Sequence, residues 1–165
     1  MPETDVHQLV GHLFRHEAGK MAAVLTRLLG FQAMDVAEDI VQDTLLKAMD
    51  AWKLKGVPEN PSAWLYTVAK RKAIDHLRQQ QARSQHHSEI NQLLQSEWTL
   101  TPTVNNLFLE NEIEDSQLLM MFACCHPAIP YEAQLALILK TLCGLSAAEI
   151  AKSFLTTEDT ITKRI

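Results

Sequence analysis

The segment DVAEDIVQDTLLKAMDAW, residues 35–52, has the period of an α-helix. At about 100° per residue, one broad side of this helix is apolar and the opposite side carries four aspartates. The apolar side comprises Val36, Ile40, Val41, Thr44, Leu45, Ala48, Met49 and Trp52. Such a helix must bury that side against other elements. Runs of alternating β-branched residues, which would predict strands, are few, so we expect an all-α protein.

Similar signals predict helices on both sides of this segment. The predicted helices span residues 4–29 (with Gly19 as a candidate break), 35–52, 61–81, 112–125, 130–143, 146–154 and 157–165, and the loop KLKGVPEN spans residues 53–60. Asn60 followed by Pro61 is a typical N-cap and first-turn pair. Residues 83–103 are polar with few apolar anchors, which indicates a linker with one short helical turn. We therefore expect two small helical domains, residues 1–83 and 112–165, joined by a polar linker at residues 84–111.

Composition favours a cytoplasmic protein. The first ten residues, MPETDVHQLV, are acidic where a secretory signal would be basic. No apolar run approaches the roughly 18 residues that a membrane helix needs. Three cysteines without framework spacing are typical of reduced thiols.

The net charge of -5 hides an uneven distribution. Residues 61–90 carry 5 basic and 2 acidic side chains, whereas residues 91–140 carry 1 and 6. In the helix at 61–81, polar and charged residues share one side and apolar residues share the other, with Lys72 falling among the apolar positions. The polar side holds Thr67, Lys70, Arg71, Asp75 and Arg78, and the apolar side holds Trp64, Leu65, Val68, Ala69, Ala73 and Leu77. Interleaved aromatic and cationic residues suit single-stranded nucleic acid, although the pattern also allows Trp64 to be a core residue.

The aspartates of the helix at 35–52 allow two interpretations. Asp35, Asp39, Asp43 and Asp50 form either a solvated face or a docking surface for a basic partner, with Gln42 and Lys47 at its edges. Carboxylates at i, i+4 spacing repel one another by a few tenths of a kcal/mol each, so the face is mildly unfavourable in isolation.

The sequence FACCHPA places two cysteines beside a histidine, and these side chains supply the ligand atoms of a zinc or thiol site. Its spacing is unsuitable, because zinc ligands usually come in pairs two to four residues apart and Cys143 has no ligand neighbour. On a helix Cys124 and Cys125 point about 100° apart. We expect no metal and no cofactor, and we expect LLMMFACC to pack inward. A thiol or metal enzyme centred on Cys124, Cys125 and His126 is the alternative.

The C-terminal stretch GLSAAEIAKSFLTTEDTITKRI has the layout of a helix-turn-helix. Ser146 with Glu149 forms a capping box, and Thr157 caps a second helix. The outward polar positions of that second helix are Thr160, Lys163 and Arg164. A generic helical hairpin remains an alternative. The last helix has no stop signal, which predicts that it is truncated.

Three motifs in order, AEDIVQDTLLKAMDAW, NPSAWLYTVAKRKAIDHLR and GLSAAEIAKSFLTTEDTITKRI, resemble the extracytoplasmic-function (ECF) sigma factors of bacterial RNA polymerase. FACCHPAI resembles the start of region 4 in an ECF subgroup whose members carry a long C-terminal extension, which has no counterpart here. The resemblance implies a sigma region 2 bundle, a region 4 helix-turn-helix and no enzymatic activity.

The resemblance also implies roles for particular residues. The helix bearing Asp35, Asp39, Gln42, Asp43 and Lys47 would dock on the β′ clamp helices. The following loop and helix would capture the melted minus-ten strand, through Lys53, Lys55, Asn60, Trp64, Thr67, Lys70, Arg71, Lys72 and Arg78. Thr157, Thr160, Lys163 and Arg164 would face the minus-thirty-five duplex, and the preceding helices would receive the β flap. An anti-sigma factor or the C-terminal extension is a candidate regulatory partner. The rival hypothesis is a stand-alone helix-turn-helix regulator, which would dimerise and bind duplex DNA without polymerase.

Overall fold

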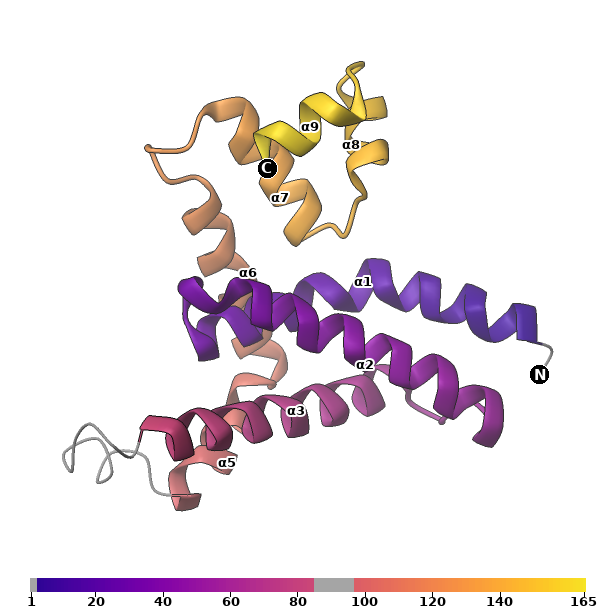
Figure 1. The fold of residues 1–165 in the computed structure, drawn as a ribbon. Helices are drawn as coiled ribbons and strands as arrows, with labels where there is room; N and C mark the ends of the chain where they lie inside the picture. Colours follow the sequence, from indigo (N-terminus) through magenta and orange to yellow (C-terminus); the bar gives the residue numbers. More distant parts are fainter. Residues whose placement is uncertain (1–2, 85–96) are drawn as a thin grey trace.

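The computed structural model describes residues 3–84 and 97–165, and within these residues all regular structure is helical (Figure 1). The long helices are α1 (Glu3–Leu29), α2 (Met34–Lys55) and α3 (Pro61–Ser84), with a short 3-10 turn (Phe31–Ala33) between the first two. They are followed by α5 (Glu97–Leu107), α6 (Glu110–Cys124), α7 (Tyr131–Thr141), α8 (Ala147–Ser153) and α9 (Glu158–Arg164). The prediction of an all-α protein is confirmed.

Glycines end the first two long helices. Gly30 has a φ of 93° and donates to the Thr26 carbonyl, and Gly56 has a φ of 83° and donates to the Trp52 carbonyl. Only glycine takes these conformations readily. Gly19 does not interrupt α1. Helix α2 continues to Lys55, so the prediction that Lys53 and Lys55 lie in a loop is wrong. Both lysines lie in the last turn of α2, where cations interact favourably with the helix dipole.

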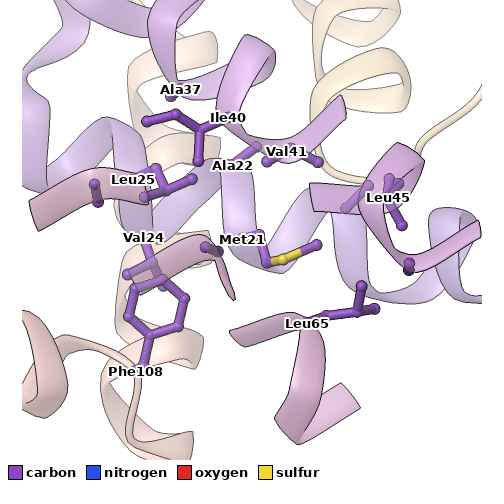
Figure 2. Close-up of a cluster of buried hydrophobic side chains, with 14 of the residues drawn as sticks. Met21, Ala22, Val24, Leu25, Ala37, Ile40, Val41, Leu45, Leu65 and Phe108 are labelled. Atoms are coloured by element: carbon purple, nitrogen blue, oxygen red, sulfur yellow. The ribbon is translucent and has the colours of Figure 1, made fainter. Parts of the chain in front are cut away.

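The main core is built around α1, which contacts α2, α3, α5, α6 and α7. Figure 2 shows its centre, where side chains of α1 meet those of α2 and α3, with Phe108 closing one side. Met21, Val24, Leu25 and Leu65 are completely buried there. These positions recur at helical spacing, so the amphipathic pattern of the sequence accounts for the core.

The segment predicted as a linker is more helical than expected. Its residues 85–96 lie outside the described part of the chain. Beyond them, α5 has 11 residues rather than one short turn. Val104 at its end and Phe108 just after it are buried in the main core, and this i, i+4 apolar pair anchors the segment to α1 and α3.

Helices α7, α8 and α9 form a second, smaller body, residues 131–165, which we name the C-terminal unit. Its core consists of Ala136, Ile150, Ala151 and Ile161. A third cluster joins this unit to the rest of the chain: Leu137, Ile138 and Leu142 of the unit, all partly buried, pack against the buried residues Ala23 of α1 and Met120 and Cys124 of α6.

The prediction that LLMMFACC packs inward is mostly wrong. Met120 and Cys124 are buried, but Phe122 and Cys125 are exposed, as are Leu118, Leu119 and Met121. Helix α6 covers α1 with one stripe only, so residues off that stripe face solvent.

We predict that Leu65→Ala lowers the free energy of unfolding by about 2–5 kcal/mol, because it leaves a cavity among α1, α2 and α3. Leu54→Ala is the matched control: Leu54 is 86% exposed, and its truncation should change stability by less than about 0.5 kcal/mol. Urea unfolding followed by circular dichroism measures both. Equal effects of the two substitutions would contradict this description of the core.

Candidate functional site

The carboxylates of α2 lie together on its solvent side. Asp35, Asp39, Asp43 and Asp50 are all exposed, and so are Gln42 and Lys47 beside them. The opposite side of the helix is buried, as the helical pattern predicts. We call the four aspartates with Gln42 and Lys47 the acidic face. It is a ridge of negative charge held on a rigid helix.

Lys72 joins this face to the neighbouring helix. Its Nζ lies 2.9 Å from Oδ2 of Asp43, and its side chain is 31% exposed. This contact explains why a lysine occupies an otherwise apolar position of α3: the stem runs along the α2–α3 contact and the ammonium reaches a carboxylate. An ion pair this exposed stabilises the fold by less than about 1 kcal/mol, so it is readily exchanged for another partner.

Two cations of α3 lie on its outer side, and two others lie at the edges of that side, toward α2 and toward Phe108. Arg71 and Arg78 are exposed, together with Thr67 and Asp75. Lys70 is half-buried, with its Nζ 5.9 Å from the centre of the Phe108 ring, at the distance of a cation–π contact. We call Lys70, Arg71, Lys72 and Arg78 the basic face. It adjoins the acidic face along the Asp43–Lys72 pair, so surfaces of opposite charge lie next to each other.

Two tryptophans meet where α2 and α3 converge. Their ring centres are 5.4 Å apart at an interplanar angle of 64°, an edge-to-face contact. Trp52 is buried, whereas Trp64 is only partly buried and packs on the outside of the core. Trp64 therefore contributes to the core while part of its ring remains accessible.

The start of α3 is held by hydrogen bonds to side chains. Asn60 Oδ1 accepts from the Ala63 backbone N–H at 3.0 Å, which confirms the predicted N-cap. Glu17 of α1 is buried and accepts hydrogen bonds from Ser62 at 3.2 Å and from Tyr66. Burial and the Glu17 carboxylate raise the pKa of Tyr66 well above its ordinary value, so the phenol stays protonated as the donor.

The sequence interpretation missed Glu17. A signal was present, since this glutamate lies on the side of α1 that is otherwise apolar. A carboxylate in such a place needs buried donors, and α3 supplies them. The effect is to fix the N-terminal turns of α3, and with them Asn60 and Trp64, against α1.

The C-terminal unit has the predicted caps. Ser146 and Glu149 form a reciprocal capping box, and Thr157 caps α9 through the Thr160 N–H. The two predicted DNA-contacting cations of α9 are engaged within the unit, Lys163 with Asp159 at 2.7 Å and Arg164 with Glu132 at 2.6 Å. Thr157 is exposed and Thr160 is partly buried.

The three cysteines lie in different environments. Cys124 is buried with its Sγ 4.0 Å from the Thr141 hydroxyl, and burial raises the pKa of its thiol. Cys125, His126 and Cys143 are exposed. Among the residues that the structure describes, no three histidine, cysteine, aspartate or glutamate side chains gather as metal ligands would.

Comparison with known families finds a match for α1 to α3. Residues 13–83, from the middle third of α1 to the last turn of α3, match the family model of sigma-70 region 2. These residues are similar to sigma-70 region 2. Both the acidic face and the basic face lie within the matched residues, and the match supports a member of the sigma factor family.

A curated relative in Rhizobium meliloti (strain 1021), described as an uncharacterized protein, is 31% identical over 137 residues. The alignment covers 82% of this chain, including most of the C-terminal half, and 31% of the relative. The chain thus spans under a third of that relative's length. No solved structure matches the chain. In the described residues, no helix is both long and apolar enough to cross a membrane.

We predict that Asn60→Ala lowers the free energy of unfolding by about 0.5–2 kcal/mol, because the Ala63 N–H loses its acceptor. Asn60→Ser should retain nearly all of the stability, since serine also caps helices. Urea unfolding distinguishes the two. An alanine variant as stable as the parent would show that Asn60 does not fix the start of α3.

Proposed function

We propose that this chain is an ECF-type sigma factor, which binds core RNA polymerase, directs it to promoters and helps to open the DNA. The observation that carries the proposal is the region 2 match on α1 to α3, with an exposed ridge of carboxylates on α2. A stand-alone helix-turn-helix regulator would account for α8 and α9 but gives no reason for a region 2 domain. In this proposal the chain has no enzymatic activity and acts in the cytoplasm, where the polymerase works.

The acidic face is the proposed docking surface. Asp39, Gln42 and Asp43 form its centre, Asp35 and Lys47 flank it, and all are exposed on one helix. We propose that they contact the β′ clamp helices. A ridge of like charges that is mildly unfavourable alone becomes favourable against a basic partner, and it steers that partner's approach.

The basic face is the proposed site for the melted minus-ten strand. Phosphates would pair with Arg71 and Arg78, and a base would stack on the accessible part of Trp64. Lys53, Lys55 and Asn60, around the turn between α2 and α3, would hold a flipped base, and Thr67 and Lys70 would line the strand's path. Unstacking a base costs a few kcal/mol and stacking on an aromatic ring returns about 1–3 kcal/mol, so DNA opening requires the polymerase to hold the duplex.

The Asp43–Lys72 pair connects these two roles. With about four cations on the basic face, single-strand binding would have a salt slope of only about -3. A polymerase cation that takes up Asp43 would release Lys72 toward the DNA. The free chain should therefore bind DNA weakly.

For the C-terminal unit we propose the role of region 4, in the ECF subgroup with Cys-Cys-His-Pro at the start of that region. Thr157, Thr160, Lys163 and Arg164 of α9 would face the minus-thirty-five duplex, and α6 and α7 would receive the β flap. Exposed apolar residues on these two helices, among them Phe122 and Tyr131, fit a protein partner there. An anti-sigma factor or a C-terminal extension would act as regulator.

The proposal predicts that Asp39→Arg combined with Asp43→Arg weakens binding to bacterial core RNA polymerase by about tenfold or more, because cations then face cations. The matched control is Glu158→Arg with Asp159→Arg, the same charge change on the exposed first turn of α9, which the proposal assigns to DNA and not to polymerase. Co-migration on a sizing column, with helix content checked by circular dichroism, is the measurement. A folded parent chain that forms no complex would overturn the proposal, and equal losses in the two double variants would overturn the assignment to the acidic face.

A further inference from the structure

Two histidines of α1 lie one helical turn apart on the same side of the helix. His12 and His16 are both exposed to solvent. Their ring centres are 4.4 Å apart, at an interplanar angle of 50°. Because residues four apart lie above one another on a helix, the backbone itself brings the two imidazoles together. His76 and His126, the other histidines whose side chains the structure describes, have no histidine three or four residues away.

The separation of the two rings suits two ligands of one metal ion. Metal–nitrogen bonds of about 2.1 Å, at right angles or tetrahedral angles, place two ligand nitrogens about 3.0 to 3.4 Å apart. Rings with centres 4.4 Å apart reach that nitrogen separation by rotation about side-chain torsions, without movement of the backbone. Two histidines at i, i+4 on one face of a helix are also the arrangement through which helical zinc motifs bind their metal.

Neighbouring charges leave the pair available to a cation. Arg15 donates to Glu149 Oε1 at 2.7 Å, and Lys20 Nζ lies 3.5 Å from Glu17 Oε1, so both cations nearest the pair on α1 are neutralised by carboxylates. This pairing weakens the repulsion that a divalent ion would meet there. Within the described part of the chain, no hydrogen bond or ion pair engages either imidazole.

The stretch of α1 that carries the pair is held in place on other sides. Val10, Leu13 and Ala18 are buried in the main core. Gly19 packs against the chain after α7: a methyl group on it would overlap the Leu142 carbonyl oxygen and stand 2.9 Å from the carbonyl carbon. Ligands held on a fixed helix lose little conformational freedom when they bind, which favours binding.

The ligand type restricts the kind of metal. Imidazole nitrogen suits Zn²⁺, Ni²⁺ and Cu²⁺, whereas Mg²⁺ and Ca²⁺ take oxygen ligands. Over the residues that the structure describes, no third histidine, cysteine, aspartate or glutamate gathers with the pair. Water would therefore complete the coordination, as it does at open metal sites, and affinity would be lower than at a structural site with four protein ligands.

We propose that His12 and His16 form a binding site for a divalent transition-metal ion of the Zn²⁺, Ni²⁺ and Cu²⁺ class. The bound ion bridges one turn of α1 and stabilises the helix there. The expectation of no metal was argued from Cys124, Cys125 and His126, and it did not weigh this pair. The site uses no residue of the acidic face or the basic face, so it does not depend on the proposed function.

Nickel titration of the full chain by calorimetry tests the site. The exposed Cys125 and Cys143 are changed to serine in every sample, so that these thiols bind no metal. His12→Gln and His16→Gln each remove one ligand from the pair. His126→Gln is the matched control, the same change at another exposed histidine.

A second control keeps the number of histidines constant. His16→Gln combined with Asn106→His moves one imidazole to an exposed position on α5. The parent should bind one Ni²⁺ at the pair. Removal of either histidine should weaken this binding by about a hundredfold or more, because the second imidazole acts as an intramolecular ligand. His126→Gln should match the parent, and Asn106→His should not restore the affinity.

Hydrogen exchange gives a readout on the helix itself. With Ni²⁺, amides across residues 12–20 should exchange more slowly in the parent and at an unchanged rate in the two single variants. Nickel affinity that survives either single substitution would overturn the site. So would losses of only about twofold in each single variant, the result for two imidazoles that bind independently, or full affinity in the variant with Asn106→His.

Discussion

The burial of α1 at the centre of the chain is the constraint on which the other features depend. Met21, Val24 and Leu25 are completely buried, and the same helix offers Glu17 to α3 and Gly19 to the C-terminal unit. Each neighbour packs against a different side of it. A change in α1 therefore reaches the acidic face through α2, the basic face through α3 and the position of α9 through the contact at Leu142.

Surfaces of opposite charge lie on the adjacent helices α2 and α3. The acidic face has four carboxylates and a single lysine, and one of its aspartates pairs with a lysine of the basic face. In the proposal, a basic protein surface would take up Asp43 and a polyanion would take up Lys72, so either partner would replace the pair. Because an exposed ion pair contributes little free energy in water, breaking it costs little. In the proposal, binding of a protein to the acidic face therefore raises the affinity of the basic face for a polyanion.

Much of this organisation could be predicted from the sequence, because it follows from the helical spacing of apolar residues and from helix-capping residues. The apolar side of α2, the N-cap at Asn60 and the capping box at Ser146 are local features, and the structure confirms them. The helical state of α5 and the exposure of one side of α6 do not follow from local sequence signals. Both depend on which stripe of the helix packs against α1. The partners of Lys72 and Arg15 lie on other helices, 29 and 134 residues away along the chain, and no local pattern specifies them. The roles of the individual site residues remain predictions.

The most direct test of the central claim, that the acidic face of α2 docks on RNA polymerase, is hydrogen exchange of the intact chain with and without core polymerase. Amide exchange across Met34–Lys55 should slow in the complex, while that of α5 (Glu97–Leu107), which carries none of the proposed docking residues, should not change. A complex that forms with exchange of α2 unchanged would contradict the account and place the polymerase contact elsewhere on the chain.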